Sequence, residues 1–131
     1  MIALDTNMLV RALVADHAEQ VAVVRRLIAG DTVFISRTVL LETEWVLRAR
    51  YKKNPPELLQ FFRALLETDD TVIEAAEEVD SALDWYAQGA DFADALHLAA
   101  CGNAAMQTFD REFCKAARDA GIAPDVRVWE F

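Results

Sequence analysis

The sequence predicts a three-layer α/β protein with a central, mostly parallel sheet of about five strands between flanking helices. Short apolar or β-branched runs alternate with segments of helical periodicity along almost the whole chain. Parallel strands need crossover connections, and helices usually provide them. The length of 131 residues suits one domain with its own core and leaves too little chain for a second. We therefore expect a single domain over residues 1–131.

The N-terminal half is predicted to contain two strands and three helices. In order, these are a strand at 2–4, a helix to 13, a helix to 30, a strand at 32–35 and a helix to about 53. Asp16 and Glu19 have capping-box spacing in front of the second helix, and Gly30 supplies its stop. Ser36 is a good N-cap for the helix that follows the second strand.

The C-terminal half continues the alternation. Its hydrophobic periodicity predicts helices at 54–66, 79–89, 91–99 and 111–120. Its β-branched and apolar runs predict strands at 71–73, 106–109 and 126–129. Asn54 and Pro55 are suited to the N-cap and first turn of one helix, and Asp91 to the N-cap of another. Gly121 should end the last helix.

Two aspartates follow predicted strands directly. Asp5 comes after the first strand and Asp110 after the fourth. Ligand sites of parallel α/β sheets lie at the carboxyl ends of the strands, so both side chains are candidates for a site. An Asp at such a turn is equally well explained as a helix N-cap. Thr6 and Asn7 can orient the neighbouring acid, although both are also capping residues.

Glu42 is a stronger candidate than Glu44. At helical spacing Glu42 has Val39 and Val46 as neighbours and no basic partner, and a buried unpaired carboxylate is costly unless a cation meets it. Glu44 has Arg48 four residues later, in the favourable order for an ion pair. We therefore interpret Glu44 as half of a solvated helix pair and expect Glu42 to hold a cation.

The remaining acidic candidates begin helices. Asp91 and Asp94 lie three residues apart on one helix face, where Asp91 is explained as the N-cap and Asp94 is expected to point into the site. Glu112 either adds a carboxylate beside Asp110 or only occupies the first helical turn. His17 and His97 have no companions at ligand spacing and are not candidates.

Composition and charge exclude several classes of protein. The formal net charge of −9 normally disfavours binding to nucleic acid. No apolar run reaches the roughly 20 residues that cross a bilayer, and no leader is recognisable, so we expect a cytoplasmic protein without a membrane partner. Cys101 and Cys114 lack companions that would indicate a disulfide scaffold or a zinc site.

Four sequence segments resemble the PIN-domain family, and within it the VapC-type toxins. They are Ile2-Ala3-Leu4-Asp5-Thr6-Asn7, Leu40-Leu41-Glu42, Asp91-Phe92-Ala93-Asp94-Ala95 and Thr108-Phe109-Asp110-Arg111-Glu112-Phe113. The resemblance spans the whole chain, and four acids in this order are more specific than any single motif. Glu112 stands where relatives often have Asp.

The resemblance implies a ribonuclease of a toxin-antitoxin system. Its acidic quartet, both catalytic and metal-binding, would be Asp5, Glu42, Asp94 and Asp110, with Glu112 and Asp91 as further metal candidates and Thr6, Asn7 and Thr108 in support. It also implies Mg²⁺ or Mn²⁺ as cofactor, RNA as substrate, a small antitoxin as partner, and a homodimer. Hard divalent ions take oxygen ligands, which suits such a quartet and hydrolysis by metal-activated water.

Basic residues near the end of the third helix are candidates for contact with the RNA backbone. The set comprises Arg48, Arg50, Lys52 and Lys53. The helix dipole favours cations at this position in any case, so the cluster has a purely structural explanation as well.

Other functions stay open on the residues alone. A receiver-like signalling domain would need paired acids after the first strand, where only Asp5 stands. A housekeeping PIN-type RNA-processing nuclease would carry the same quartet as a toxin. A catalytically silent PIN-like module that binds metal or protein should have a broken quartet, whereas all four acids are present.

Overall fold

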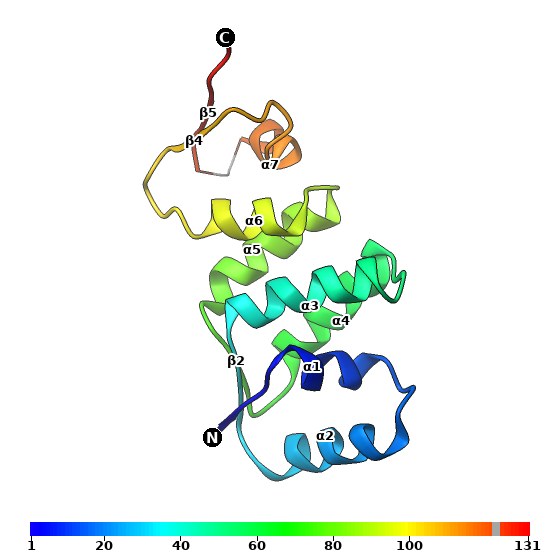
Figure 1. Cartoon of the computed structure of the whole chain (residues 1–131). Helices are drawn as coiled ribbons and strands as arrows, with labels where there is room; N and C mark the ends of the chain where they lie inside the picture. Colours follow the sequence, from blue (N-terminus) through cyan, green and yellow to red (C-terminus); the bar gives the residue numbers. More distant parts are fainter. Residues whose placement is uncertain (122–123) are drawn as a thin grey trace. The chain divides into compact units, whose positions relative to one another are not determined.

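The computed structural model describes residues 1–121 and 124–131 (Figure 1). The chain divides into two compact units, Met1–Ala76 and Glu77–Phe131, which we call unit 1 and unit 2. Each unit has its own buried apolar side chains. The single domain expected for the whole chain stays a prediction.

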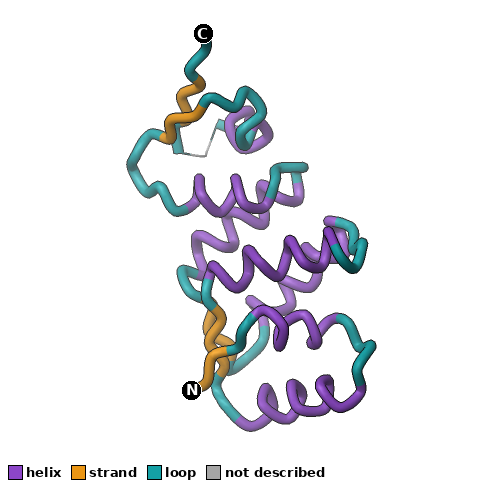
Figure 2. Tube along the Cα trace, viewed as in Figure 1, coloured by secondary structure: helices purple, strands orange, loops and turns teal. Residues whose placement is uncertain are grey.

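Unit 1 contains a short parallel sheet and four helices. Its elements are β1 (Ile2–Ala3), α1 (Thr6–Leu13), α2 (Ala18–Gly30), β2 (Val33–Ile35), α3 (Arg37–Ala49), α4 (Pro55–Glu67) and β3 (Thr71–Ile73). In Figure 2 the three strands lie side by side, and helices make up most of the rest of the unit. α1 packs against both α2 and α3, and α4 packs against β3 and α3.

The sheet of unit 1 has the order β1-β2-β3, with every pair parallel. Ile2 is in register with Val33, and Val33 with Thr71. β2 is the central strand and buries Val33 and Ile35 to 1% exposure. The order places the carboxyl ends of β1 and β2, and with them Asp5 and Ser36, at the same edge of the sheet.

Unit 2 contains the remaining helices and a pair of strands. Its elements are α5 (Ala76–Ala87, which begins at the last residue of unit 1), α6 (Phe92–Ala99), β4 (Met106–Thr108), α7 (Lys115–Ala120) and β5 (Val126–Val128). Tyr86 of α5 meets Phe92 of α6 edge to face, with ring centroids 5.3 Å apart. Leu83 of α5 and Leu98 of α6 are fully buried, as expected for the apolar faces that the helical periodicity predicts.

The predicted mixture of helices and parallel strands is confirmed, but the single sheet of about five strands is wrong. In the part of the chain that the structure describes, the five strands form a three-stranded sheet and a separate parallel pair, β4-β5. Sequence periodicity identifies strands but not their partners. The Met106 amide donates to the Asp125 carbonyl, and the Trp129 amide donates to the Thr108 carbonyl, so β4 is paired with β5.

Several predicted helix ends differ from the structure. α5 covers Ala76–Ala87 instead of 79–89. Asp16 does not cap α2, because its carboxylate pairs with Arg11 at 2.6 Å; His17 takes the N-cap position. α3 ends at Ala49 rather than near residue 53, since Lys52 has a positive φ of 56°. α7 begins at Lys115, after Cys114 in the left-handed region, instead of at residue 111.

The other predicted caps are confirmed. Ser36 accepts from the Val39 amide, Asn54 from the Glu57 amide and Asp91 from the Asp94 amide. Gly121 has φ +73° and ends α7. Among the described helices, no segment combines the length and the apolar character needed to cross a membrane.

Candidate functional site

Unit 1 contains a polar pocket of about 330 Å³ beside the end of β1. Its lining residues are Asp5, Thr6, Asn7, Val39, Glu42, Trp45, Val46 and Arg50. They come from the first turn of α1 and from one face of α3, which pack against each other. Half of the predicted acidic quartet, Asp5 and Glu42, therefore shares one pocket.

Asp5 is both a helix cap and a pocket residue. Its Oδ1 accepts a hydrogen bond of 3.0 Å from the Met8 amide, as an N-cap does. The side chain is exposed, and a carboxylate has about four lone-pair positions, so the cap leaves acceptor capacity toward the pocket. The two explanations that the sequence left open for Asp5 are compatible.

Thr6 links α1 to Glu42. The Thr6 side chain is 7% exposed, and its hydroxyl donates to Oε1 of Glu42 across 36 residues of sequence. A buried hydroxyl that bonds a carboxylate fixes the orientation of that carboxylate. Thr6 thus acts on Glu42 rather than on the adjacent Asp5.

The burial expected for the two glutamates of α3 is reversed in the structure. Glu42 is exposed, while Glu44 is only 3% exposed. The ion pair of Glu44 with Arg48 is confirmed at 2.9 Å, but it is not solvated on the Glu44 side. The argument that burial of an unpaired Glu42 requires a cation is therefore wrong. Glu42 remains a candidate because it lines the pocket with Asp5.

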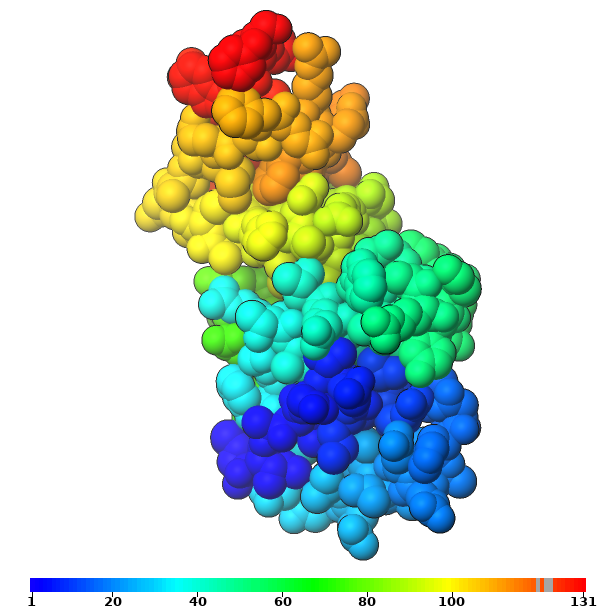
Figure 3. Space-filling model, viewed as in Figure 1, coloured from blue at the N-terminus to red at the C-terminus, as the bar shows by residue number. Residues whose placement is uncertain are grey.

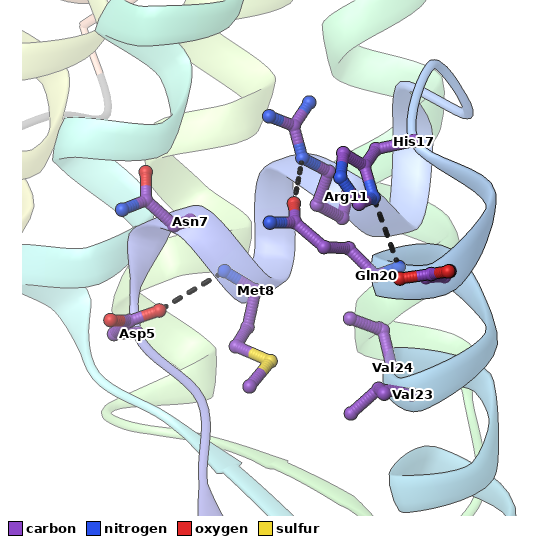
Figure 4. A pocket seen from close by; sticks show the side chains of 9 residues that line it. Asp5, Asn7, Met8, Arg11, His17, Gln20, Val23 and Val24 are labelled. Carbon is purple, nitrogen blue, oxygen red and sulfur yellow. Dashed lines mark hydrogen bonds between the residues drawn. The ribbon is translucent and has the colours of Figure 1, made fainter.

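A second pocket of about 470 Å³ lies between α1 and α2 of unit 1 (Figure 4). Its lining residues are Asp5, Asn7, Met8, Arg11, His17, Glu19, Gln20, Val23 and Val24. Arg11 donates to the Gln20 side chain, and Nδ1 of His17 accepts from the Gln20 amide. Asp5 and Asn7 line both pockets, so they stand between the two hollows.

The four basic residues near the end of α3 have different environments. Arg48 pairs with Glu44, Lys53 lies 3.8 Å from Glu57, and Lys52 donates to the Ala49 carbonyl. Arg50 lines the pocket that contains Asp5 and Glu42 and lies over the Trp45 ring. Of this set, Arg50 is the residue positioned beside the carboxylates.

Unit 2 contains an acidic pocket of about 570 Å³. Its lining residues are Gly89, Ala90, Asp91, Asp94, Asp110, Glu112, Lys115 and Ala116. The start of α6 and the turn after β4 supply its four carboxylates. The second half of the predicted quartet, Asp94 and Asp110, is thus brought together with both further metal candidates.

Asp94 experiences the negative charge of this pocket. Burial raises the pKa of the Asp94 carboxyl, and the charges of Asp91 and Asp110 raise it further, against a smaller opposing effect of His97. A group whose ionised form is disfavoured by neighbouring carboxylates gains from a nearby cation. The carboxylates of this cluster therefore repel one another, and this repulsion disfavours the ionised form of Asp94.

Asp110 is held by a local turn. Its backbone amide donates to the Thr108 hydroxyl at 3.0 Å, and its Oδ1 accepts from the Glu112 amide at 2.9 Å. Such bonds from side chains to nearby backbone compete with a helix. They explain why residues 111–114 form a turn and why Thr108 acts on the backbone of the acid rather than on its carboxylate.

Comparison with known families identifies the chain. A model of the PIN domain matches residues 2–119, which include all four quartet acids and parts of both units. The chain belongs to the PIN-domain family. Searches of curated proteins and of solved structures gave no match. PIN domains are generally nucleases, typically dependent on a divalent metal such as Mg²⁺ or Mn²⁺.

The residues of this PIN domain fit a hard divalent cation by their chemistry. Both pockets offer carboxylate oxygens, the ligands that Mg²⁺ and Mn²⁺ prefer. The negative charge around Asp94 is the kind that such a cation offsets. Across residues 1–121 and 124–131, no group of three or more His, Cys, Asp or Glu side chains is arranged to hold a metal ion.

Sequence reasoning missed two residues of the PIN-domain pockets. Lys115 lines the acidic pocket of unit 2 as a cation among four carboxylates. Its spacing of three from Glu112, which places both on one face of the helix predicted over 111–120, was a signal for it. Trp45 lines the pocket of unit 1 with 49% exposure. In the sequence alone, Trp45 is only an apolar residue three positions after Glu42.

Proposed function

We propose that this PIN domain is a divalent-metal-dependent endoribonuclease, and that it is the toxin of a type II toxin-antitoxin pair. The observation that carries the nuclease proposal is the family match over residues 2–119, which includes Asp5, Glu42, Asp94 and Asp110. The pocket positions of all four support it, since each side chain lines a polar hollow.

In this proposal the four acids act in one reaction as metal-holding and catalytic residues. When bound, Mg²⁺ or Mn²⁺ supplies charge neutralisation at the phosphate and lowers the pKa of water. Thr6 orients Glu42 through its hydroxyl, and Thr108 orients the Asp110 backbone. Asn7 presents an amide beside Asp5, while Asp91 and Glu112 add acceptor oxygens next to Asp94.

The net charge of −9 makes local cations important for binding RNA. Arg50 beside Glu42 and Lys115 beside Asp94 are side-chain cations that line the two pockets with the acids. A phosphate needs such partners next to carboxylates, in addition to the metal. We propose that Arg50 guides the RNA backbone; the other three basic residues of its cluster have partners of their own.

The toxin proposal adds an antitoxin and a second copy of the chain as partners. Support comes from the resemblance to VapC-type toxins and from the chemistry of the pockets, because exposed carboxylates suit an arginine of an inhibitor segment. The alternative is a housekeeping RNA-processing nuclease with the same chemistry. Growth arrest on expression, relieved by the product of a neighbouring small gene, separates the two.

The decisive experiment measures cleavage of a labelled RNA pool by the purified chain in Mg²⁺, in Mn²⁺ and in EDTA. We expect cleavage with either metal and none in EDTA. Asp5→Asn, Glu42→Gln, Asp94→Asn and Asp110→Asn should each reduce the initial rate by more than about 100-fold, because residues that only orient metal ligands already contribute roughly 10–100-fold.

Matched controls are Asp69→Asn in unit 1 and Asp119→Asn in unit 2. Both carboxylates are exposed and line neither acidic pocket, so both variants should cleave at the parent rate. Cleavage that persists in EDTA, or a quartet variant as active as its control, would show that the proposed chemistry is wrong.

A further inference from the structure

Unit 2 exposes three aromatic side chains at the end of its strand pair. Phe109 is 73% exposed, Trp129 is 45% exposed, and Phe131 is fully exposed. In the space-filling view the last residues of the chain, coloured red, lie on the exterior of unit 2 (Figure 3). Exposed apolar surface of this kind is unfavourable in water and commonly marks a binding site.

The strand register explains why these rings gather on one face. β4 and β5 pair in parallel with Gln107 opposite Arg127 and Thr108 opposite Val128. Side chains alternate between the two faces of a strand, so the next pair in this register, Phe109 and Trp129, lies on the same face as Gln107 and Arg127. We call Gln107, Phe109, Arg127, Trp129 and Phe131 the aromatic face.

The rings of the aromatic face are held in place by polar contacts. The Trp129 indole N–H donates to Oε1 of Gln107 at 2.6 Å, and the Arg127 guanidinium lies 3.9 Å from the Trp129 ring centroid. The Phe109 and Phe131 rings are 5.5 Å apart. A groove of about 340 Å³ runs along this face. The face is therefore a preformed stacking surface with a fixed cation.

The chemistry of the groove favours a nucleobase. Among the described residues, those that line it are Gln107, Thr108, Phe109, Trp129 and Phe131, and none of these five side chains carries a negative charge. Arg127 adds a positive one. In a chain of net charge −9, such a surface is compatible with RNA. Aromatic rings stack every base, and arginine adds a cation–π contribution.

The size of the face argues against a protein occupant. A stable protein interface uses about 20–30 residues from each partner, whereas this groove is lined by five. Its position points to the substrate, because Phe109 directly precedes Asp110 of the acidic pocket. The aromatic face and the acidic pocket are thus supplied by adjacent residues of one segment.

We propose that the aromatic face is a binding subsite for the unpaired bases of single-stranded RNA, centred on Phe109 and Trp129. This rests on the proposed ribonuclease function, whose substrate it specifies as single-stranded. A duplex keeps its bases stacked on each other and offers none to the face. The subsite explains how an acidic protein retains RNA while its carboxylates repel the backbone.

The test is a binding titration, separate from cleavage. A fluorescein-labelled single-stranded RNA octamer is titrated with the full chain in EDTA, which stops metal-dependent hydrolysis, and a duplex of the same length is titrated in parallel. Trp129→Leu and Phe109→Leu keep apolar bulk but remove stacking. Each should weaken binding to the octamer roughly tenfold, whereas Trp129→Phe should bind within about threefold of the parent.

The outcomes are distinguishable from those of the nuclease assay. If the parent fails to bind the octamer, or if both leucine variants bind it as tightly as the parent while circular dichroism shows them folded, the subsite is wrong. A concentration-dependent dimer that Trp129→Leu abolishes, with RNA affinity unchanged, assigns the face to self-association and overturns the proposal. Binding that depends on Trp129 without any cleavage supports the subsite and rejects only the nuclease function.

Discussion

Three aspartates of the candidate site use one carboxylate oxygen to hold a backbone amide. Asp5 bonds the Met8 amide, Asp91 that of Asp94, and Asp110 that of Glu112. These bonds fix the position of each carboxylate and leave its second oxygen for other ligands. Holding a backbone amide and the proposed binding of a metal are therefore compatible uses of one carboxylate, and the bond to the amide supplies the rigidity that a binding site requires.

Asp94 should make the fold less stable at neutral pH. Its pKa is raised from 3.8 by burial and by the charges of Asp91 and Asp110. The folded state then binds the proton more tightly than the unfolded chain, so the free energy of unfolding falls as pH rises through the interval above 3.8. In EDTA at pH 7, Asp94→Asn should be more stable than the parent.

Urea denaturation in EDTA between pH 7 and pH 4 checks this prediction. The stability difference between Asp94→Asn and the parent should shrink toward pH 4, while Asp119→Asn, at an exposed position of α7, should follow the parent at every pH. A difference that stays constant with pH would contradict the assigned cause. Together with the cleavage assay, the same variant would show a residue that costs stability and supplies activity.

For the two glutamates of α3, sequence reasoning did not identify which side chain is buried. Glu44 has Leu40 and Leu47 at helical spacing, both at most 1% exposed, so it lies on the buried stripe. The ion pair with Arg48 was inferred correctly, but an arginine reaches inward to a buried carboxylate along its own apolar stem. A partner at i+4 therefore does not indicate exposure.

At the level of elements, caps were the most reliable signal. Ser36, Asn54 and Asp91 were identified from sequence because each bond joins a side chain to an amide three residues later. The predicted N-cap at Asp16 is wrong because Arg11 pairs with its carboxylate. The start of α7 failed for a similar reason, since the turn bonds of Asp110 and the left-handed Cys114 replace the first helical turn.

The cap of α4 gives a direct test of this reasoning. Asn54 accepts from the Glu57 amide at 2.9 Å, and two prolines follow it. Asn54→Ala removes the acceptor and should lower the free energy of unfolding by about 1 kcal/mol, whereas Asn54→Asp should retain most of the stability. Thermal or urea unfolding measures both. Equal stability of the alanine variant and the parent would refute the cap's contribution.

Sheet pairing was the part of the fold that sequence reasoning could not supply. All five strands were placed within one or two residues, but each is only two or three residues long. A strand of this length is too short to carry a sequence pattern that selects one neighbouring strand over another. The candidate site shows the same limit: the acids were predicted by type and position, while the bond of Thr6 to Glu42 and the place of Lys115 in the acidic pocket required three dimensions.

For the whole molecule, we predict one cooperative unfolding transition. The length of 131 residues predicts a single domain, and the family match runs through the boundary between units at Ala76. A single domain should give equal calorimetric and van't Hoff enthalpies and one midpoint by every probe. Scanning calorimetry measures this. Two separated transitions would mean that the units unfold independently.

The central position of β2 sets a hierarchy of solvent protection. β2 bonds β1 on one side and β3 on the other, whereas β5 pairs with β4 alone in the described part of the chain. Amide protons of Val33 and Ile35 should therefore exchange with deuterium only when unit 1 opens completely, while the Trp129 amide, which donates to the Thr108 carbonyl, exchanges through local fraying. The best protected strand amides then belong to the sheet whose first strand leads into Asp5, and the least protected strand amides belong to the pair that leads into the aromatic face.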